Sequence, residues 1–237
     1  MIYVVRHSER LDYIDEKKWE RSKRFKEHGL DPPLTQNGKD IARNTIKLIL
    51  DKEKKSNDVK YIYSSPATRC IETSIAMQKY IKETFDVLPK IRIENGLLFF
   101  DANSTIWWFN RENIKYKNNY FEISYDKEII DDKMTTEYYE KLYPGSFDVS
   151  HKSIIKRDII NKDKNFKSLD RRIKCLIKLF PKCDQDINIL CTHGENLELI
   201  NNYLNKKWIH DDKRRFTNRN WCAWMKIVNN KIVETSK

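Results

Sequence analysis

Apolar positions along the chain follow two different periods, and each period predicts one kind of element. Short runs in which β-branched and aromatic residues are continuous, or alternate with polar ones, are typical of strands. The predicted strands cover residues 2–5, 59–63, 91–94, 187–191 and 222–228, and the last of them turns at Asn229 and Asn230 into residues 232–233.

Longer segments repeat apolar residues every three or four positions, as a helix with one buried face does. Such helices are expected at about residues 36–50, 67–82, 135–142, 166–180 and 195–204. Thr35 is the predicted N-cap of the first helix, whose inward positions would be Ile41, Thr45, Leu48 and Ile49. Residues 11–30 are polar, and we interpret them as a loop with room for one helical turn that crosses the mouth of a site.

The order of these elements favours an α/β fold, because strands alternate with helices. Between residues 97 and 166 the periodicity is poor and aromatic residues are dense. Because this stretch has no Gly/Ser-rich linker and no repeat, we interpret it as an insertion that folds over the site as a cap. All 237 residues are then expected to form one domain.

Composition and charge restrict the class of partner. The net charge is +11 and the pI is near 9.3, which favours phosphate esters, nucleic acid or acidic membrane surfaces. Because the lysines are scattered, a solvated basic surface is favoured over a nucleic-acid patch. The five cysteines include no CxxC pair, so neither a disulfide framework nor a zinc site is expected. Without an evident signal peptide or an apolar run of membrane-spanning length, we expect a cytoplasmic protein.

Charged residues gather where two predicted strands end. The first strand runs into residues 6–10, where His7 lies between two arginines, and the strand at 187–191 is followed by His193. Arg69 lies in the first turn of the helix at 67–82. Ligands bind at the carboxyl ends of strands in open α/β sheets, and guanidinium groups fit phosphate oxygens. The pattern favours phosphoryl transfer through a phosphohistidine; the alternative for residues 6–10 alone is a charged surface turn.

Several short motifs occur in an order that resembles one family. Residues 6–10 read Arg-His-Ser-Glu-Arg where the family pattern begins Arg-His-Gly, and further matches lie at residues 31–38, 64–73, 91–97 and 192–194. Their order resembles the histidine phosphatase superfamily, branch 1, the phosphoglycerate-mutase-like proteins. The Asp-Pro-Pro-Leu-Thr and Arg-Cys-x-Glu-Thr details look closest to the TULA-type phosphatase domains (suppressors of T-cell-receptor signalling).

The resemblance implies a three-layer αβα fold with a mostly parallel central sheet, and chemistry without a metal or cofactor. It implies that His7 is the nucleophile that takes the phosphoryl group and that His193 completes the pocket. Glu94 would be the general acid and then the base, with a pKa raised by the aromatic cap, and Asp101 is the alternative acid. The residues that would bind the phosphate oxygens are Arg6, Arg10 and Arg69.

Ser8 departs from the family pattern, which has glycine at this position. The substitution adds a side chain where the backbone approaches the phosphate closely. Because serine is small and its hydroxyl can donate to a phosphate oxygen, we expect Ser8 to join the phosphate site and activity to survive.

Three functions are consistent with these residues. The first is a phosphomonoesterase acting on a phosphorylated small molecule or a phosphotyrosine-type substrate. The second is a phosphoglycerate-type mutase, and the third is an inactive module that binds a phospholigand. The complete set of two histidines, three arginines and an acid favours the first, because a binding module does not need all of them. No membrane or metal partner is expected, nucleic acid is disfavoured, and a homodimer is left open.

Overall fold

The computed structural model describes residues 1–28, 31–53, 59–98, 114–117, 120–123, 135–155, 186–205, 216 and 220–236. A six-stranded sheet with the order β3-β2-β6-β1-β7-β8 forms the centre of these residues. Its strands are β1 (Ile2–Arg6), β2 (Val59–Ser64), β3 (Lys90–Ile93), β6 (Ile187–Thr192), β7 (Trp224–Val228) and β8 (Lys231–Thr235). β3, β2, β6 and β1 are parallel to one another. β7 pairs antiparallel with β1, and β8 pairs antiparallel with β7. The predicted α/β fold with a mostly parallel sheet is confirmed.

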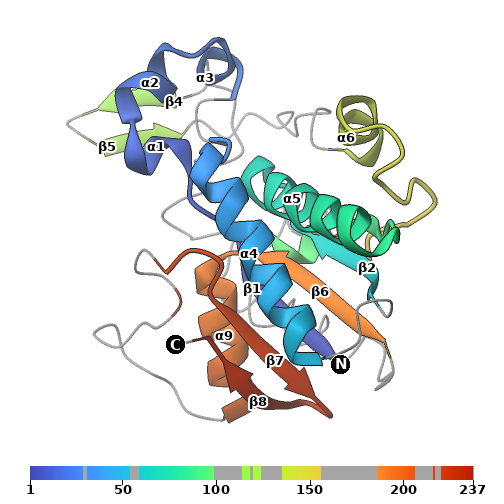
Figure 1. Cartoon of the computed structure of the whole chain (residues 1–237). Helices are drawn as coiled ribbons and strands as arrows, with labels where there is room; N and C mark the ends of the chain where they lie inside the picture. Colours follow the sequence, from blue (N-terminus) through green and yellow to red (C-terminus); the bar gives the residue numbers. More distant parts are fainter. Residues whose placement is uncertain are drawn as a thin grey trace.

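Helices cover both faces of this sheet (Figure 1). Helices α4 (Gln36–Glu53) and α5 (Thr68–Phe85) pack with Tyr3 and Val5 of β1 in one apolar cluster. Val4 points to the opposite face and packs in a second cluster with α9 (Gly194–Asn205). Because successive side chains of a strand alternate between faces, the apolar β1 feeds both cores, and the three predicted layers are present.

The predicted helix at 36–50 is confirmed, and so is most of its predicted buried face, because Thr45 and Ile49 are buried and Ile41 packs against the core. Thr35 caps it as expected, since its Oγ1 accepts a hydrogen bond from the Gly38 amide at 2.8 Å. Leu48, however, is 58% exposed, whereas Ala42 and Ile46 are fully buried. The buried stripe of α4 therefore includes Ala42 and Ile46 and leaves Leu48 in solvent.

The prediction of a loop at residues 11–30 is wrong for most of that segment. It forms three short helices, α1 (Leu11–Ile14), α2 (Glu16–Arg21) and α3 (Lys23–His28). Asp15 caps α2 by accepting a hydrogen bond from the Lys18 amide at 2.9 Å. Trp19 is the buried anchor of α2 and meets Phe25 edge to face. A single buried residue in α2 and none in α1 carry too little periodicity to reveal such helices in the sequence.

The stretch predicted to form the cap is described only in part. It contains the hairpin of β4 (Ile114–Lys117) and β5 (Tyr120–Ile123), and the expected helix near 135–142, which is α6 (Thr136–Leu142). The helix expected at 166–180 lies outside the described residues, and the cap itself stays a prediction. In the described parts of the chain, no helix is both long and apolar enough to cross a membrane.

Candidate active site

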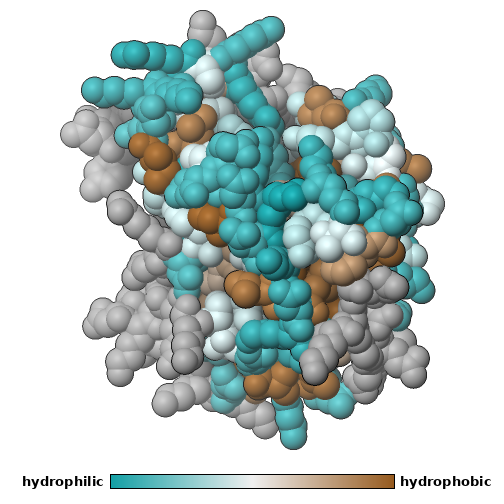
Figure 2. Space-filling view, in the orientation of Figure 1, coloured by the Kyte–Doolittle hydropathy of each residue, from teal (hydrophilic) through white to brown (hydrophobic). Residues whose placement is uncertain are grey.

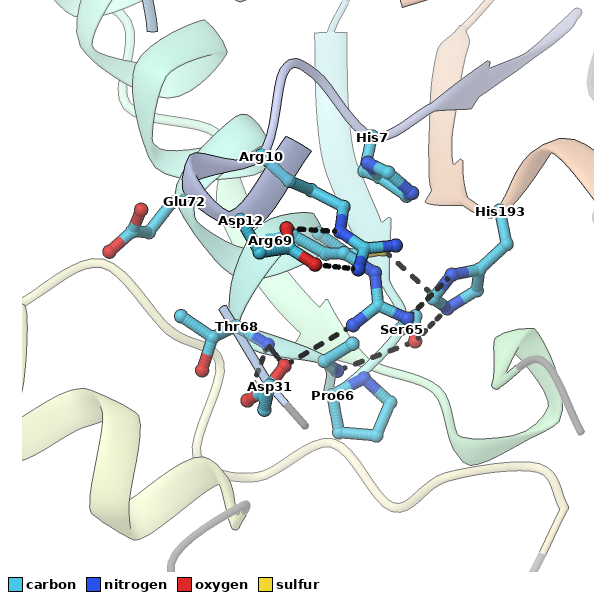
Figure 3. Close-up of polar contacts among 12 residues, drawn as sticks. His7, Arg10, Asp12, Asp31, Ser65, Pro66, Thr68, Arg69, Glu72 and His193 are labelled. Atoms are coloured by element: carbon cyan, nitrogen blue, oxygen red, sulfur yellow. Dashed lines mark hydrogen bonds and ion pairs between the residues drawn. The ribbon is translucent and has the colours of Figure 1, made fainter. Parts of the chain in front are cut away.

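The two strand-end histidines lie together because their strands are neighbours. β1 and β6 pair in parallel with Arg6 opposite Thr192, so the next residue of each strand is a histidine. The ring centroids of His7 and His193 are 5.6 Å apart. Figure 3 shows both imidazoles facing the guanidinium groups of Arg10 and Arg69. The predicted convergence of four site residues at one sheet edge is therefore present.

The hydrogen bond made by His7 determines which of its nitrogens is available. Nδ1 lies 2.8 Å from the carbonyl oxygen of Ser8. Because a carbonyl only accepts, Nδ1 carries the proton and Nε2 has the free lone pair. Burial lowers the pKa of His7 well below its usual value, and the nearby Arg69 and His193 lower it further. His7 is therefore a neutral imidazole with Nε2 unprotonated at neutral pH.

His193 has the opposite tautomer. Its Nδ1 lies 3.2 Å from Nη2 of Arg69, and a guanidinium only donates, so Nδ1 accepts. Nε2 then carries the proton and donates to Ser65 Oγ at 3.1 Å, with the Cys70 thiol 3.7 Å away. The arrangement fixes the ring between α5 and the end of β2. Both ring nitrogens of His193 therefore have protein partners, and its role in a phosphate pocket stays a prediction.

Arg69 is positioned at the N-terminus of α5 by a residue from a distant segment. The Asp31 carboxylate accepts two hydrogen bonds from the Thr68 amide, at 3.0 and 3.1 Å, and lies 3.4 Å from Nη1 of Arg69. Burial, and then Arg10, lower the pKa of Arg69, while Asp31 is among the groups that oppose this shift. Asp31 therefore caps the helix and also balances a buried cation that the helix dipole disfavours.

Arg6 lies at the end of β1 beneath an aromatic ring. Its guanidinium is 4.7 Å from the ring centroid of Trp221, and Nη1 donates to the Asn220 carbonyl at 3.4 Å. Burial lowers the pKa of Arg6, and the Glu195 carboxylate acts in the opposite direction. Its buried Nε has no hydrogen-bond partner among the described residues. A buried guanidinium N–H without a partner is a donor that an anionic ligand can use.

Arg10 completes the cationic group from the other side of the pocket. It forms a two-point ion pair with Asp12, in which Nε donates to Oδ1 at 3.0 Å. Its guanidinium also lies 4.5 Å from the ring centroid of Tyr13. These contacts hold a long, flexible side chain in the position shown in Figure 3.

The backbone of the loop after β1 is held by the segment that follows residue 30. Thr35 N donates to the Glu9 carbonyl at 3.1 Å, and Leu11 N donates to the Pro33 carbonyl at 2.9 Å. Gly38 packs so closely that a Cβ there would lie 2.5 Å from the Glu9 carbonyl oxygen. The rigid Pro-rich segment and this glycine therefore set the path of the chain between His7 and Arg10.

Ser8 is placed in the loop, but its side chain is fully buried. Its amide donates to Thr73 Oγ1 at 2.9 Å. Its hydroxyl oxygen is buried and has no hydrogen-bond partner among the described residues. The hydroxyl acts to lower the pKa of the nearby Cys222 thiol, which burial raises to about 11. The described contacts of Ser8 are thus with the protein interior, and its expected hydrogen bond to a phosphate oxygen stays a prediction.

Glu94 is fully buried at the end of β3. Its carboxylate accepts hydrogen bonds from the Gly96 amide, the Ser153 hydroxyl and the amides of Ile154 and Ile155, at 2.7–3.2 Å. These contacts tie the short 3-10 helix η1 (Asn95–Leu97) to residues 153–155. They describe a structural carboxylate. The catalytic role of Glu94 stays a prediction, and the alternative Asp101 lies outside the described residues.

Residues that sequence reasoning did not assign to the site include Asp31, Ser65, Tyr13 and Trp221. The Asp31 motif was visible, but its contact with α5 joins segments far apart in the sequence. The aromatic pair lies outside any motif, so only the fold brings it to the pocket. Within the described segments, no group of three or more His, Cys, Asp or Glu side chains could hold a metal ion.

The fold is a mixed α/β fold with histidines and arginines where its central parallel strands end. The sequence profile of the histidine phosphatase superfamily (branch 1) matches residues 2–94, which is less than half of the chain.

Two known proteins illustrate the likeness. An uncharacterized phosphoglycerate mutase family protein of Acanthamoeba polyphaga mimivirus is 30% identical over 93 residues, which are 39% of this chain and only 43% of that protein. The fold is similar to the crystal structure of ecdysone phosphate phosphatase from Bombix mori in complex with tungstate, with a TM-score of 0.60 and 16% identity over 98% of this chain and 91% of the other.

Proposed function

We propose that the protein is a phosphomonoesterase that works through a phosphohistidine on His7. The observation that carries the proposal is the state of this imidazole. Nδ1 is fixed by the Ser8 carbonyl, and burial together with nearby cations lowers the pKa, so Nε2 holds its lone pair at neutral pH. A neutral, oriented imidazole beside buried guanidinium groups is suited to attack a phosphate ester.

The cations around His7 supply the electrostatic part of the mechanism. In the transition state the transferred phosphoryl group carries negative charge on three oxygens, and fixed hydrogen-bond donors in a buried site stabilise that charge strongly. Arg6 contributes its unpartnered Nε, and all three guanidinium groups lie close enough to His7 to lower its pKa. In the proposal these three side chains bind the phosphate oxygens, and His193 completes their pocket.

The reaction has two balanced steps. The Nε2 lone pair forms a bond to phosphorus as the ester P–O bond breaks, and the leaving oxygen receives a proton to become an alcohol. Water then attacks phosphorus and gives one proton to the group that donated in the first step, the P–N bond breaks with its electron pair returning to Nε2, and inorganic phosphate leaves with His7 neutral again. The proton donor of the first step is the role predicted for Glu94, with Asp101 as the alternative.

The first test is hydrolysis of p-nitrophenyl phosphate by the wild type and by His7→Ala, with vanadate as inhibitor. We expect vanadate-sensitive activity that falls by about 10³-fold or more in the variant, because the covalent step is lost. The exposed Lys47→Ala on α4 is the matched control and should retain activity. A wild type that is inactive from acidic to neutral pH would contradict the proposal.

Chemical trapping tests the intermediate separately. A phosphohistidine is labile to acid and stable to base, so rapid quenching with labelled substrate should yield a base-stable phosphoenzyme. Its persistence in His7→Ala would assign the nucleophile elsewhere. The general acid is tested by comparing Glu94→Gln with Asp101→Asn, because loss of the proton donor should slow alkyl phosphates far more than p-nitrophenyl phosphate.

The proposal also includes the class of substrate and the location of the protein in the cell. A phosphorylated small molecule and a phosphotyrosine-type substrate both fit the phosphate chemistry, and the motif likeness to TULA-type phosphatase domains favours the second. A cytoplasmic location is supported by Cys70, Cys191 and Cys222, which are buried and unbridged. The test for substrate is a comparison of kcat/KM for phosphotyrosine peptides and for metabolite phosphates.

A further inference from the structure

Two aromatic rings stand directly beside the phosphate-binding arginines. Trp221 lies over Arg6, and Tyr13 lies over Arg10. The two rings meet edge to face, with centroids 5.4 Å apart. Trp221 is also 6.2 Å from the His7 ring. Tyr13 belongs to α1, and Trp221 lies in the chain before β7. Together the two rings connect Arg10 to Arg6 next to His7.

These two rings are not buried in the protein core. Tyr13 is 53% exposed, its neighbour Ile14 is 62% exposed, and α1 has no buried residue. Figure 2 shows apolar residues interrupting the hydrophilic surface in the region of α1–α3. A four-residue helix that leaves its tyrosine and isoleucine in solvent beside a polar pocket exposes apolar area that a ligand can cover.

We propose that Tyr13 and Trp221 bind the leaving group of the substrate, and that the preferred substrates are phosphate monoesters of aromatic or other flat, apolar alcohols. The inference rests on the proposed phosphatase function and specifies its substrate class. A phosphate held by Arg6 and Arg10 beside His7 places its ester oxygen within reach of the two rings. Flat apolar groups gain buried area and edge-to-face contacts there, whereas small charged alcohols such as glycerate or serine gain neither.

A second role of the rings is to orient the guanidinium groups through cation–π contacts. The two roles predict different results. Loss of orientation alone weakens the binding of every phosphate compound in the same proportion, including inorganic phosphate and vanadate. Loss of a leaving-group subsite weakens only aromatic compounds, so the ratio between aryl and alkyl compounds is the informative quantity.

The kinetic test compares kcat/KM for phenyl phosphate and glycerol 2-phosphate in the wild type, Trp221→Ala and Tyr13→Ala. Because each variant is compared with the wild type on the same substrate, the intrinsic reactivity of each ester cancels. We expect phenyl phosphate to lose about fivefold to tenfold and glycerol 2-phosphate less than twofold, with Trp221→Phe and Tyr13→Phe retaining most of the preference. Leu48→Ala, an exposed apolar residue on α4, is the control. Equal losses for both esters would overturn the inference.

Binding of non-hydrolysable analogues separates this inference from the proposed activity. Benzylphosphonate should bind the wild type more tightly than methylphosphonate in calorimetry, and Trp221→Ala should remove most of the difference. If the wild type hydrolyses no ester but shows this preference, the phosphatase proposal fails and the aromatic subsite stands as a ligand site. If the enzyme is active but binds both phosphonates equally, the subsite is refuted and the phosphatase proposal is untouched.

Discussion

The imidazole of His7 is kept neutral first by burial and then by Arg69. Because the neutral form is the nucleophile in the proposed mechanism, kcat/KM should fall only when the pH drops through a pKa that lies below 6.5. Arg69→Gln removes a positive neighbour, so the pKa of His7 rises and the acid limb of the kcat/KM profile moves to higher pH. The maximum of kcat/KM should also be lower, because one of the proposed phosphate-binding cations is lost. The measurement is a pH profile of kcat/KM for both proteins.

The control for this shift is Arg43→Gln, since Arg43 pairs with Glu83 between α4 and α5 and is not a pocket residue. Its profile should overlay that of the wild type. An acid limb that stays in place in Arg69→Gln would show that Arg69 does not influence the nucleophile.

Gly38 is a residue whose missing side chain matters. A Cβ would meet the Glu9 carbonyl oxygen at 2.5 Å, so Gly38→Ala must displace either α4 or the loop that carries His7 and Arg10. We expect a loss of about 1–3 kcal/mol in the free energy of unfolding. We also expect kcat/KM to fall further than this loss of stability explains, because the displaced loop carries His7 and Arg10. Urea unfolding and kinetics of Gly38→Ala, with Lys47→Ala on the same helix as reference, test this; two indistinguishable variants would contradict it.

At the scale of the element, the start of α5 depends on Asp31. Its carboxylate caps the helix and pairs with Arg69 while both side chains are 5% exposed. Asp31→Ala leaves a buried cation and a helix N–H without their partner, which costs about 3 kcal/mol or more. Asp31→Asn keeps one accepting oxygen and should fall between the wild type and alanine. Unfolding in urea gives the ranking, and inhibition by inorganic phosphate reports whether Arg69 has moved.

The elements also show where sequence reasoning succeeds and fails. Strands such as β1 and β6 were predictable because their apolar runs are local and end in charged residues. The buried face of α4 was predictable in part, because Thr45 and Ile49 are buried as expected. Leu48 was not, since it lies next to the buried stripe of the helix and only the packing against α5 and the sheet decides that it stays exposed. The helices α1–α3 were hidden because Trp19 alone is buried in α2.

The same distinction applies to the site. Arg6, His7, Arg69 and His193 were predictable from strand and helix ends, whose geometry in an α/β sheet brings them to one edge. The partners that hold them were not, because contacts such as Asp31 with Arg69 or Trp221 with Arg6 join segments that no local pattern links.

For the whole molecule, buried neutral histidines make stability depend on pH. Burial lowers the pKa of both His7 and His151. As the pH falls through about 6.5, the unfolded chain binds protons at these positions and the folded chain does not, so stability declines by up to about 1.4 kcal/mol per pH unit for each histidine. Urea unfolding at pH 7.0 and 5.5 should show this decline.

The histidine variants identify its source. His151→Gln should reduce the difference between the two pH values without abolishing it, because His7 still contributes. Equal free energies of unfolding at both pH values in the wild type would refute the linkage.

The position of β1 in the sheet has a consequence for how the protein is made. β1 lies between β6 and β7, so both of its neighbours follow residue 186. A chain emerging from the ribosome carries His7 first and the two strands that hold β1 last, and pairing over such a separation is slow. Recovery of activity during refolding should therefore trail helix formation, and residues 2–94 alone should be inactive although they contain the family pattern.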